Sequence, residues 1–328
     1  MWDYYRRLQP NIQTVVKARQ LVYNYVMVTK YSHNGLTWID VEAPTGDEVK
    51  ALMSEYHIHP LVGEEFMIPS EKTKVDVYDH YLYLTLHFPT REGSKETSHE
   101  IDFLVGTNYC ITLHYEPIEA LTTFSKVFET HSILNKKEEG EHGGFLFYFI
   151  VKKLYAAVGY DLDGIKSRLQ HVEREIFKGN ERDQVFELST QSRKLLDCKQ
   201  TLFGHKEVLE SFKEASAKFF GPAFLPHADL LVDEHVRTYT TILASKEFLH
   251  DLRDTNDSLL SAKQSEIMKL FTVSAFVTFP LVLTVEILSI PSVANPLHGN
   301  PHDFWIIIGV VVVAAYGMFN YFKSKKWL

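Results

Sequence analysis

Two strongly apolar runs near the end of the chain constrain its fold more than any other feature of the sequence. Residues 270–290 read LFTVSAFVTFPLVLTVEILSI and hold one charge, and residues 304–322 read FWIIIGVVVVAAYGMFNYF and hold none. About 20 apolar residues form a helix long enough to cross the hydrocarbon core of a bilayer. The two runs therefore predict a transmembrane hairpin, and a pair of buried helices in a soluble core is the less favoured alternative.

Basic residues flank this hairpin on one side only. Lys263 and Lys269 precede the first run and three lysines at positions 323–326 follow the second, whereas the connector 291–303 has no Lys or Arg. Short loops rich in Lys and Arg stay on the cytoplasmic side of a membrane. We therefore expect a multi-pass protein of the inner (plasma) membrane, with the lipid bilayer as a partner and both termini in the cytoplasm.

The remainder of the chain has a soluble composition. The formal net charge is −8, and nearly all charged residues lie at or before Lys269. This acidity and the lack of a basic stripe argue against a nucleic-acid partner. The chain has no P-loop, nucleophile elbow or glycine-rich dinucleotide turn, so we expect neither an enzyme nor a bound cofactor. The two cysteines have no CxxC spacing, which is typical of reduced thiols.

Residues 1–142 are predicted to form a mixed α/β cytoplasmic domain. The segments LTWIDVEAP, KVDVYDHYLYLTLHF and IDFLVGTNYCITLHY are β-rich, and TGDEVKALMSEY is typical of a helix with Thr45 as its N-cap. The segment REGSKETSHE, residues 91–100, is predicted to be a polar loop. Apolar residues at three- and four-residue steps then predict a cytoplasmic helical region over 143–226.

A stretch without Gly or Pro from about Asp229 to Phe279 predicts one long helix. If that helix continues into the first apolar run, it covers about 60 residues, or about 90 Å. We therefore expect an α/β cytoplasmic domain, a long stalk helix and a two-helix transmembrane hairpin. The expected segments are a stalk at 227–269, spans at 270–290 and 304–322, an extracytoplasmic connector at 291–303 and a basic tail at 323–328.

The long helix is predicted to carry one distinctive face. A helix advances about 100° per residue, so the direction of each side chain can be compared with that of Glu286. Within about 20° of that direction lie Phe279, Ala275, Met268, Ser261 and Asp257. Within about 40° lie Asp254, Thr272 and Val282. This face is acidic and polar in the stalk, apolar through the span, and acidic again at the outer end.

Glu286, the single charge of the first run, has two interpretations. A carboxylate facing lipid is unfavourable by about 2.5–3.5 kcal/mol at the bilayer centre and by less near an end. Glu286 lies about 6 Å from the end of the span, so it can reach the headgroups or be protonated. Alternatively it faces a water-filled axis, where a symmetric oligomer forms an anionic ring that concentrates cations.

Several segments together resemble one membrane protein family. WIDVEAPTGDEV (38–49), HIHPL (57–61) and KVDVYDHYLYLTL (74–86) match its N-terminal landmarks. LLSAKQSEIMKLFTVSAFVTFPL (259–281) matches its junction between stalk and span, and YFKSKKWL matches its C-terminal tail. The chain resembles the CorA family of divalent-cation transporters over most of its length.

The resemblance implies a homopentamer with a funnel-shaped cytoplasmic domain and a central pore lined by the first span of each subunit. The transported divalent cation is then a substrate and a possible regulator. Asp254 would line the cytoplasmic throat. The pore-facing positions carried over from the family are Ser265, Met268, Phe271, Ala275, Phe279 and Val282.

One family signature is missing. The family has Tyr-Gly-Met-Asn at the end of the first span as its selectivity filter, whereas the matching positions here are Leu288, Ser289, Ile290 and Pro291. Glu286 and Ser289 are therefore the filter candidates, and the ions to consider are Mg²⁺ and transition metals such as Zn²⁺, Co²⁺ or Ni²⁺. The alternative is a family member that has lost conduction and acts as a membrane-bound regulatory or scaffold protein.

Other candidate metal ligands are weaker. His298 and His302 are four residues apart, but Pro296, Gly299 and Pro301 make a helix unfavourable there, so a solvated loop is the favoured interpretation. HADLLVDEH (227–235) has a metal-like composition that the start of an acidic helix explains equally well. Asp76 and Asp79 lie near an expected subunit surface, where the family uses acidic pairs to sense intracellular Mg²⁺, but the residues of such a site stay unassigned.

Overall fold

The computed structural model describes residues 27–33, 35–70, 72–92, 95–129, 142–290 and 302–325. The chain divides into two compact units. The first comprises Met1–Glu173 and Phe186–His250, and the second comprises Arg174–Val185 and Asp251–Leu328. The first unit holds a sheet and most of the helices, and the second holds one interhelical turn and the apolar helices.

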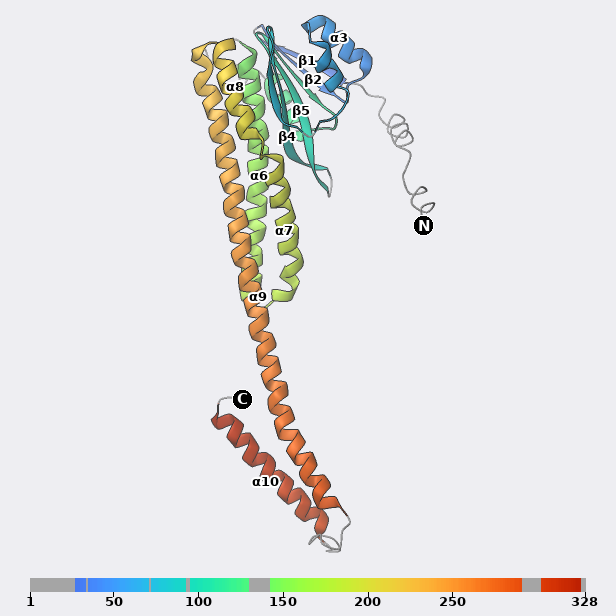
Figure 1. Ribbon diagram of the computed structural model, residues 1–328, viewed down its shortest axis with the longest axis vertical. Helices are drawn as coiled ribbons and strands as arrows, with labels where there is room; N and C mark the ends of the chain where they lie inside the picture. Colours follow the sequence, from blue (N-terminus) through green and yellow to red (C-terminus); the bar gives the residue numbers. More distant parts are fainter. Residues whose placement is uncertain are drawn as a thin grey trace, which may run out of the picture. The chain divides into compact units, whose positions relative to one another are not determined.

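A six-stranded sheet forms the centre of the first unit, with the strand order β1-β2-β6-β5-β4-β3. Neighbouring strands are antiparallel except for β2 and β6, which are parallel. Figure 1 shows α3 on one side of the sheet and α6 and α8 on the other. The strands are β1 Met27–His33, β2 Leu36–Glu42, β3 Lys74–Val77, β4 Tyr81–Glu92, β5 Lys95–Gly106 and β6 Tyr109–His114.

Helices α3 (Gly46–Tyr56) and α4 (Pro60–Glu65) begin at the caps that their sequences encode. Thr45 accepts from the backbone N–H of Glu48, and the Glu48 carboxylate accepts from the backbone N–H of Thr45, which confirms the predicted N-cap as a capping box. The apolar faces of these helices join the sheet in one core. Its buried members include Ile39, Val41, Val49, Leu52, Phe66, Tyr83, Leu104, Ile111 and Leu113.

The prediction of a polar loop at residues 91–100 is wrong. β4 extends to Glu92 and β5 begins at Lys95, so most of this segment belongs to a long hairpin. Its register pairs Thr90 with Thr97 and Glu92 with Lys95. The residue types of this segment are not typical of a strand. The strands extend through it because the apolar part of the hairpin already aligns the ladder of hydrogen bonds between them.

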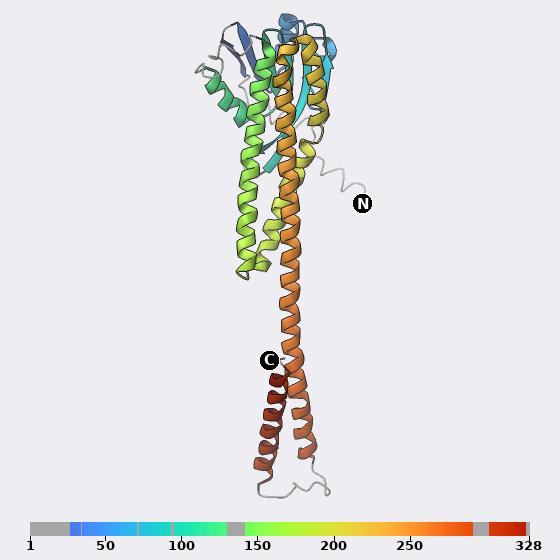
Figure 2. The ribbon, with the colours of Figure 1, turned by 90° about the vertical axis from the view of Figure 1, so that its left-hand side faces the viewer.

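Four helices follow the sheet in the sequence. These are α5 Glu119–Glu129, α6 Gly143–Phe177, α7 Glu181–Thr201 and α8 His205–Phe219. Aromatic rings fill the space between the sheet and α6 and α8, where Phe147 contacts Phe103 at 5.1 Å and Phe212 at 4.4 Å between ring centroids. Figures 1 and 2 both show α6 beside the N-terminal part of α9, where Tyr155 meets His235.

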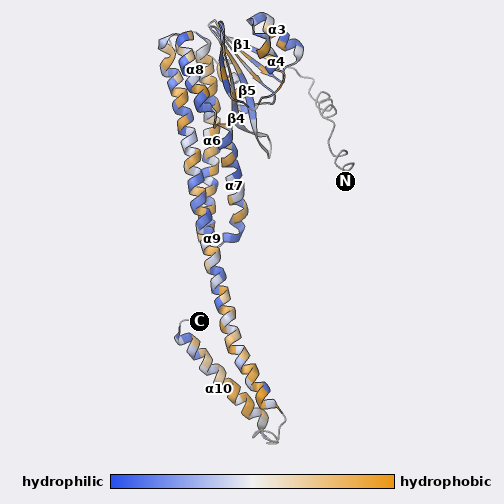
Figure 3. Ribbon diagram, viewed as in Figure 1, coloured by the Kyte–Doolittle hydropathy of each residue, from blue (hydrophilic) through white to orange (hydrophobic). Residues whose placement is uncertain are grey.

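The predicted long helix is confirmed. A short 3-10 turn at Pro222–Phe224 precedes α9, which runs without a break over 65 residues, Leu225–Ser289. At 1.5 Å per residue it is about 97 Å long. The last helix, α10, is Asp303–Ser324. Within the described parts of the chain, two helices are long and apolar enough to cross a membrane, and Figure 3 shows hydrophobic residues dominating α10 and the end of α9.

Candidate functional site

The face of α9 predicted to line an ion pathway is exposed in the single chain. Every candidate on it that the structure describes is accessible to solvent, including the largest side chains, Phe271 and Phe279, at 67% and 76%. A continuous helix keeps the 100° spacing, so these positions stay within about 60° of the direction of Glu286. They are Asp254, Asp257, Ser261, Ser265, Met268, Phe271, Thr272, Ala275, Phe279, Val282, Glu286 and Ser289.

Three residues on the opposite side of the same helix are buried. Leu252, Asn256 and Val273 are 4%, 1% and 4% exposed, and they lie about 120–160° from the direction of Glu286. These three are the buried residues of α9 after His250, and other positions on the same side, such as Glu266 and Leu270, are exposed. The candidate face is left available for contact with other molecules or with copies of the same chain.

Lys263, also on the back of α9, attaches this helix to the turn between α6 and α7. Its Nζ donates to the Gly179 carbonyl oxygen at 3.0 Å and to Glu181 Oε2 at 2.5 Å. Glu181 is buried although it starts a helix. Positions 181 and 263 are 82 residues apart, so no local pattern in the sequence indicates this pair.

Two threonine hydroxyls bond to carbonyl oxygens inside the apolar part of α9. Thr272 Oγ1 donates to the Met268 carbonyl and Thr284 Oγ1 donates to the Pro280 carbonyl, both at 2.8 Å. A hydroxyl that has given its proton to the backbone keeps its oxygen lone pairs as acceptors. Thr272 lies on the candidate face, so it offers an oxygen that can accept a hydrogen bond from the water shell of a cation.

The C-terminal end of α9 is rich in oxygen and poor in positive charge. Glu286 is exposed in the last turn, and this turn contains no basic residue. The final carbonyl groups of a helix lack helical partners and carry partial negative charge, so a carboxylate beside them is unfavourable without a counter-ion. The Ile287 carbonyl accepts from the Ile290 N–H at 3.4 Å. The end of this helix therefore concentrates negative charge.

The candidate pair of His298 and His302 is not tested, because His298 lies outside the described residues. His302 is exposed at the N-cap position of α10 and makes no side-chain cap hydrogen bond. Among the residues that the structure describes, no group of three or more His, Cys, Asp and Glu side chains is placed to hold a metal ion.

The histidines of the 227–235 segment pack against rings. His227 stacks on Phe224 with a ring-centroid distance of 5.8 Å, and His235 lies beside Tyr155. Burial lowers the pKa of His235 to about 4, so this imidazole is neutral at pH 7. The acidic-helix interpretation of this segment agrees with these contacts.

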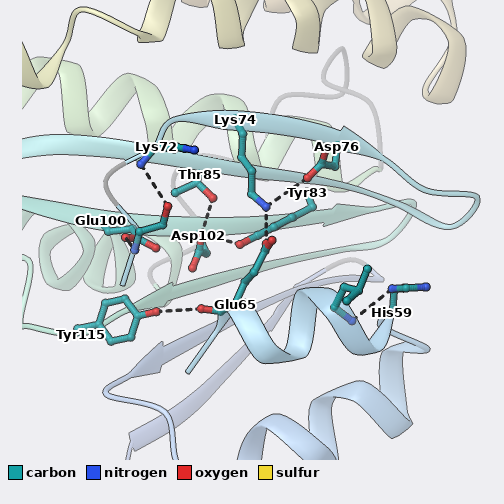
Figure 4. Close-up of polar contacts among 12 residues, drawn as sticks. His59, Glu65, Lys72, Lys74, Asp76, Tyr83, Thr85, Glu100, Asp102 and Tyr115 are labelled. Carbon is teal, nitrogen blue, oxygen red and sulfur yellow. Dashed lines mark hydrogen bonds and ion pairs between the residues drawn. The ribbon is translucent and has the colours of Figure 1, made fainter. Parts of the chain in front are cut away.

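A polar cluster beneath β3–β5 was not foreseen from the sequence. Lys74 forms ion pairs with Glu65 and with Asp76, the second at 3.3 Å, and its Nζ lies 4.7 Å from the centre of the Tyr83 ring (Figure 4). Asp102 accepts hydrogen bonds from the hydroxyls of its neighbours in the sheet. Asp76 is thus engaged within its own subunit, while Asp79 is exposed. The sensing role considered for these two acids stays a prediction.

Comparison with known proteins gives one consistent result. The Thermotoga maritima cobalt/magnesium transport protein CorA is 24% identical over 298 residues, which cover 89% of this chain and 83% of that protein. The Bacillus subtilis putative metal ion transporter YfjQ is 21% identical, over 97% of this chain and 98% of that protein.

Solved structures share the fold. The complete structure of the CorA magnesium transporter from Methanocaldococcus jannaschii matches with a TM-score of 0.79 at 19% identity, covering 94% of this chain and 100% of that one. The full-length CmaX protein matches with a TM-score of 0.70 at 15% identity, over 88% of each chain. A family model described as CorA-like Mg2+ transporter protein matches residues 33–325, and the chain therefore belongs to the CorA family.

Proposed function

We propose that the chain is a membrane channel or transporter for divalent cations in which the exposed face of α9 lines the pathway. The observation that carries this proposal is that every described candidate position on the Glu286 face is exposed, whereas the three buried residues of this part of α9 lie on the opposite side. Relatives of similar length are named as transporters of cobalt, magnesium or other metal ions. The proposed spans are residues 270–290 and 304–322, with both termini in the cytoplasm.

The pathway requires several copies of the chain. Two spans cannot enclose a pore, and Ile267, Met268, Leu270 and Phe271 are all more than half exposed in the single chain. Apolar side chains displayed around a lone helix mark a surface that contacts another molecule. Copies of the same chain around an axis would cover this surface and bring one Glu286 from each copy together. The family resemblance makes a homopentamer the proposed assembly.

Glu286 is the proposed replacement for the missing filter. A ring of carboxylates beside the carbonyl groups that end α9 would bind a cation electrostatically and hold its water shell by hydrogen bonds. Mg²⁺ gives up its waters reluctantly, so a filter that contacts the hydrated ion suits it. Ser289 adds a hydroxyl one turn further out. An inside-negative potential favours entry of a divalent cation by about 4.6 kcal/mol per 100 mV, so no enzymatic energy source is needed.

The second candidate function is a non-conducting member of the family that acts as a regulator or scaffold. The two phenylalanines of the candidate face, at positions 271 and 279, favour it, because side chains exposed at 67% and 76% can close an axis. This candidate predicts an assembled protein without flux. The carboxylate in the last turn of α9 favours conduction, because it has no role in a closed apolar plug.

Flux into proteoliposomes tests the proposal. Mg²⁺, Co²⁺, Ni²⁺ and Zn²⁺ uptake would be measured with and without a pH gradient, for the unaltered chain, Glu286→Gln and the control Glu266→Gln. Glu266 is an exposed carboxylate of α9 that points about 160° away from Glu286. We expect Glu286→Gln alone to lose most of the flux. Flux that both variants retain would remove Glu286 from the mechanism, and assembled protein that passes no ion would support the regulatory role.

A further inference from the structure

The turn between α6 and α7 is built to hold a cation at a fixed place. Gly179 adopts a left-handed conformation with φ 96°, and its N–H donates to the Ile176 carbonyl. Glu175 ties the turn together, accepting from Lys178 Nζ and from Asn180 Nδ2, both at 2.7 Å. These contacts fix the direction of the Gly179 carbonyl oxygen before any other part of the chain meets it.

Lys263 of α9 is the cation that this turn holds. Its ammonium group donates to the Gly179 carbonyl and to Glu181, whose side chain is only 5% exposed. The hydrogen bond from Lys263 lowers the pKa of Glu181, so its carboxylate stays charged at neutral pH. A buried carboxylate requires a partner of opposite charge, and within the described residues Lys263 is the one that the structure places on it.

This contact is placed to control rotation of α9 about its own axis. Lys263 points about 140° away from Glu286, so the turn contacts the side of the helix opposite the candidate face and leaves that face open. The contact lies about 10 Å before the proposed span begins at Leu270. A rotation of α9 by one residue position, about 100°, would take Lys263 out of reach and would also turn Met268, Ala275 and Glu286 off the axis.

We propose that Glu181 is a positioning residue for the ion pathway. Through its contact with Lys263, Glu181 fixes the rotation of α9 about its own axis and so directs the Glu286 face toward the oligomer axis. The inference rests on the proposed function, because it gives that face its role. Nothing in the local sequence singles out the pair, since one partner starts α7 and the other is one of two lysines that precede the span.

The test compares two cysteines on opposite sides of α9 in the full-length oligomer in liposomes. Ala275→Cys lies on the Glu286 face and Val273→Cys lies on the buried back, and the two native cysteines, Cys110 and Cys198, are buried. The measured quantity is the ratio of their labelling rates with a small charged thiol reagent. In the otherwise unaltered chain we expect the cysteine at 275 to label faster than the one at 273.

Glu181→Gln should lower this ratio by at least about fivefold, because the contact no longer favours one rotation of α9. Lys263→Gln should do the same, and the double variant should fall no further, because both changes break one contact. The matched control is Lys178→Gln, which removes an ion pair from the same turn without touching α9. An equal effect of Lys178→Gln would indicate a loosened turn and overturn the proposal.

The outcomes separate this inference from the proposed function. A ratio that does not change in Glu181→Gln overturns the positioning role, even if the protein conducts. A ratio that falls as expected in a protein without metal flux supports the positioning role and leaves the transport proposal refuted. Equal labelling at 273 and 275 in the otherwise unaltered chain would contradict the assigned orientation of α9, and the positioning role with it.

Discussion

Replacing Asp102 with asparagine is expected to change how the stability of the first unit depends on pH. Asp102 lies on β5 and is 1% exposed. Its Oδ1 accepts from Thr85 Oγ1 at 2.7 Å and from Tyr83 Oη at 3.0 Å, whereas Oδ2 has no hydrogen-bond partner among the described residues (Figure 4). Burial, assisted by the nearby charge of Glu100, raises the pKa of Asp102 to about 7.

The sign and size of the effect follow from this pKa. An ordinary aspartate has a pKa of about 3.9, so the folded protein holds this proton more tightly than the unfolded chain does. Such a group contributes stability that is fully present below about pH 4 and is lost as the pH rises through about 7. At 1.36 kcal/mol per pH unit, Asp102 accounts for a loss of at most about 3 kcal/mol between pH 5 and pH 8.

Two histidines act in the same direction and must be separated from Asp102. Burial opposes protonation of His87 and His114, but hydrogen bonds to Glu100 and Asp40 outweigh it, so the pKa of each is raised. Their contributions to stability also fall with rising pH. Both are present in the two proteins, but the charge of Asp102 contributes to the raised pKa of His87, so the difference between the unaltered chain and Asp102→Asn reports the carboxyl group together with its effect on His87.

Thermal unfolding of the full-length protein in detergent between pH 5 and pH 8 provides the measurement. Asparagine can accept from both hydroxyls but leaves an amide without a partner, so we expect a lower absolute Tm for the variant at every pH. The decrease in Tm from pH 5 to pH 8 should be smaller in the variant, by at most roughly 6–12 °C at about 2–4 °C per kcal/mol. Parallel curves for the two proteins would refute the raised pKa.

Three further substitutions test the packing of the first unit, each by thermal unfolding. Phe212→Ala removes a fully buried ring and should lower the stability by about 3–5 kcal/mol. Trp38→Phe removes the 2.9 Å hydrogen bond from Nε1 to Thr112 Oγ1 and should lower the stability by about 1–2 kcal/mol. Unfolding of Phe212→Ala and Trp38→Phe at the same temperature as the unaltered chain would contradict the assigned core. Gly143→Ala places a Cβ 2.2 Å and 2.3 Å from two backbone carbonyl oxygens and should be poorly folded, whereas the control Gly159→Ala meets open space and should be tolerated.

The long helix and its two-sided character could be predicted because they depend on local pattern. The absence of Gly and Pro between Asp229 and Phe279 permits one continuous helix, and the structure confirms it over Leu225–Ser289. The 100° spacing then places every residue around its axis. The capping box at Thr45 is predictable for the same reason, since both of its partners lie within one turn of helix.

Features that depend on distant partners could not be predicted. The hairpin at 91–100 is extended by register with a neighbouring strand, although its own residues are typical of a loop. The contact of Lys263 with Glu181 joins positions 82 residues apart. The raised pKa of Asp102 depends on burial within a sheet whose strand order the sequence does not reveal. In each case the partner comes from a distant part of the chain, and the local sequence pattern does not indicate which residue that partner is.

The position of a bound cation in the assembled oligomer tests the central claim most directly. Crystals of the full-length protein soaked in Co²⁺ would be measured at the cobalt absorption edge, where anomalous scattering locates the metal without ambiguity. A carboxylate filter predicts a peak on the symmetry axis at the level of Glu286, surrounded by one carboxylate from each subunit. An axis closed by Phe271 and Phe279, with Glu286 directed toward lipid and no metal beside it, would rule out Glu286 as part of a cation pathway.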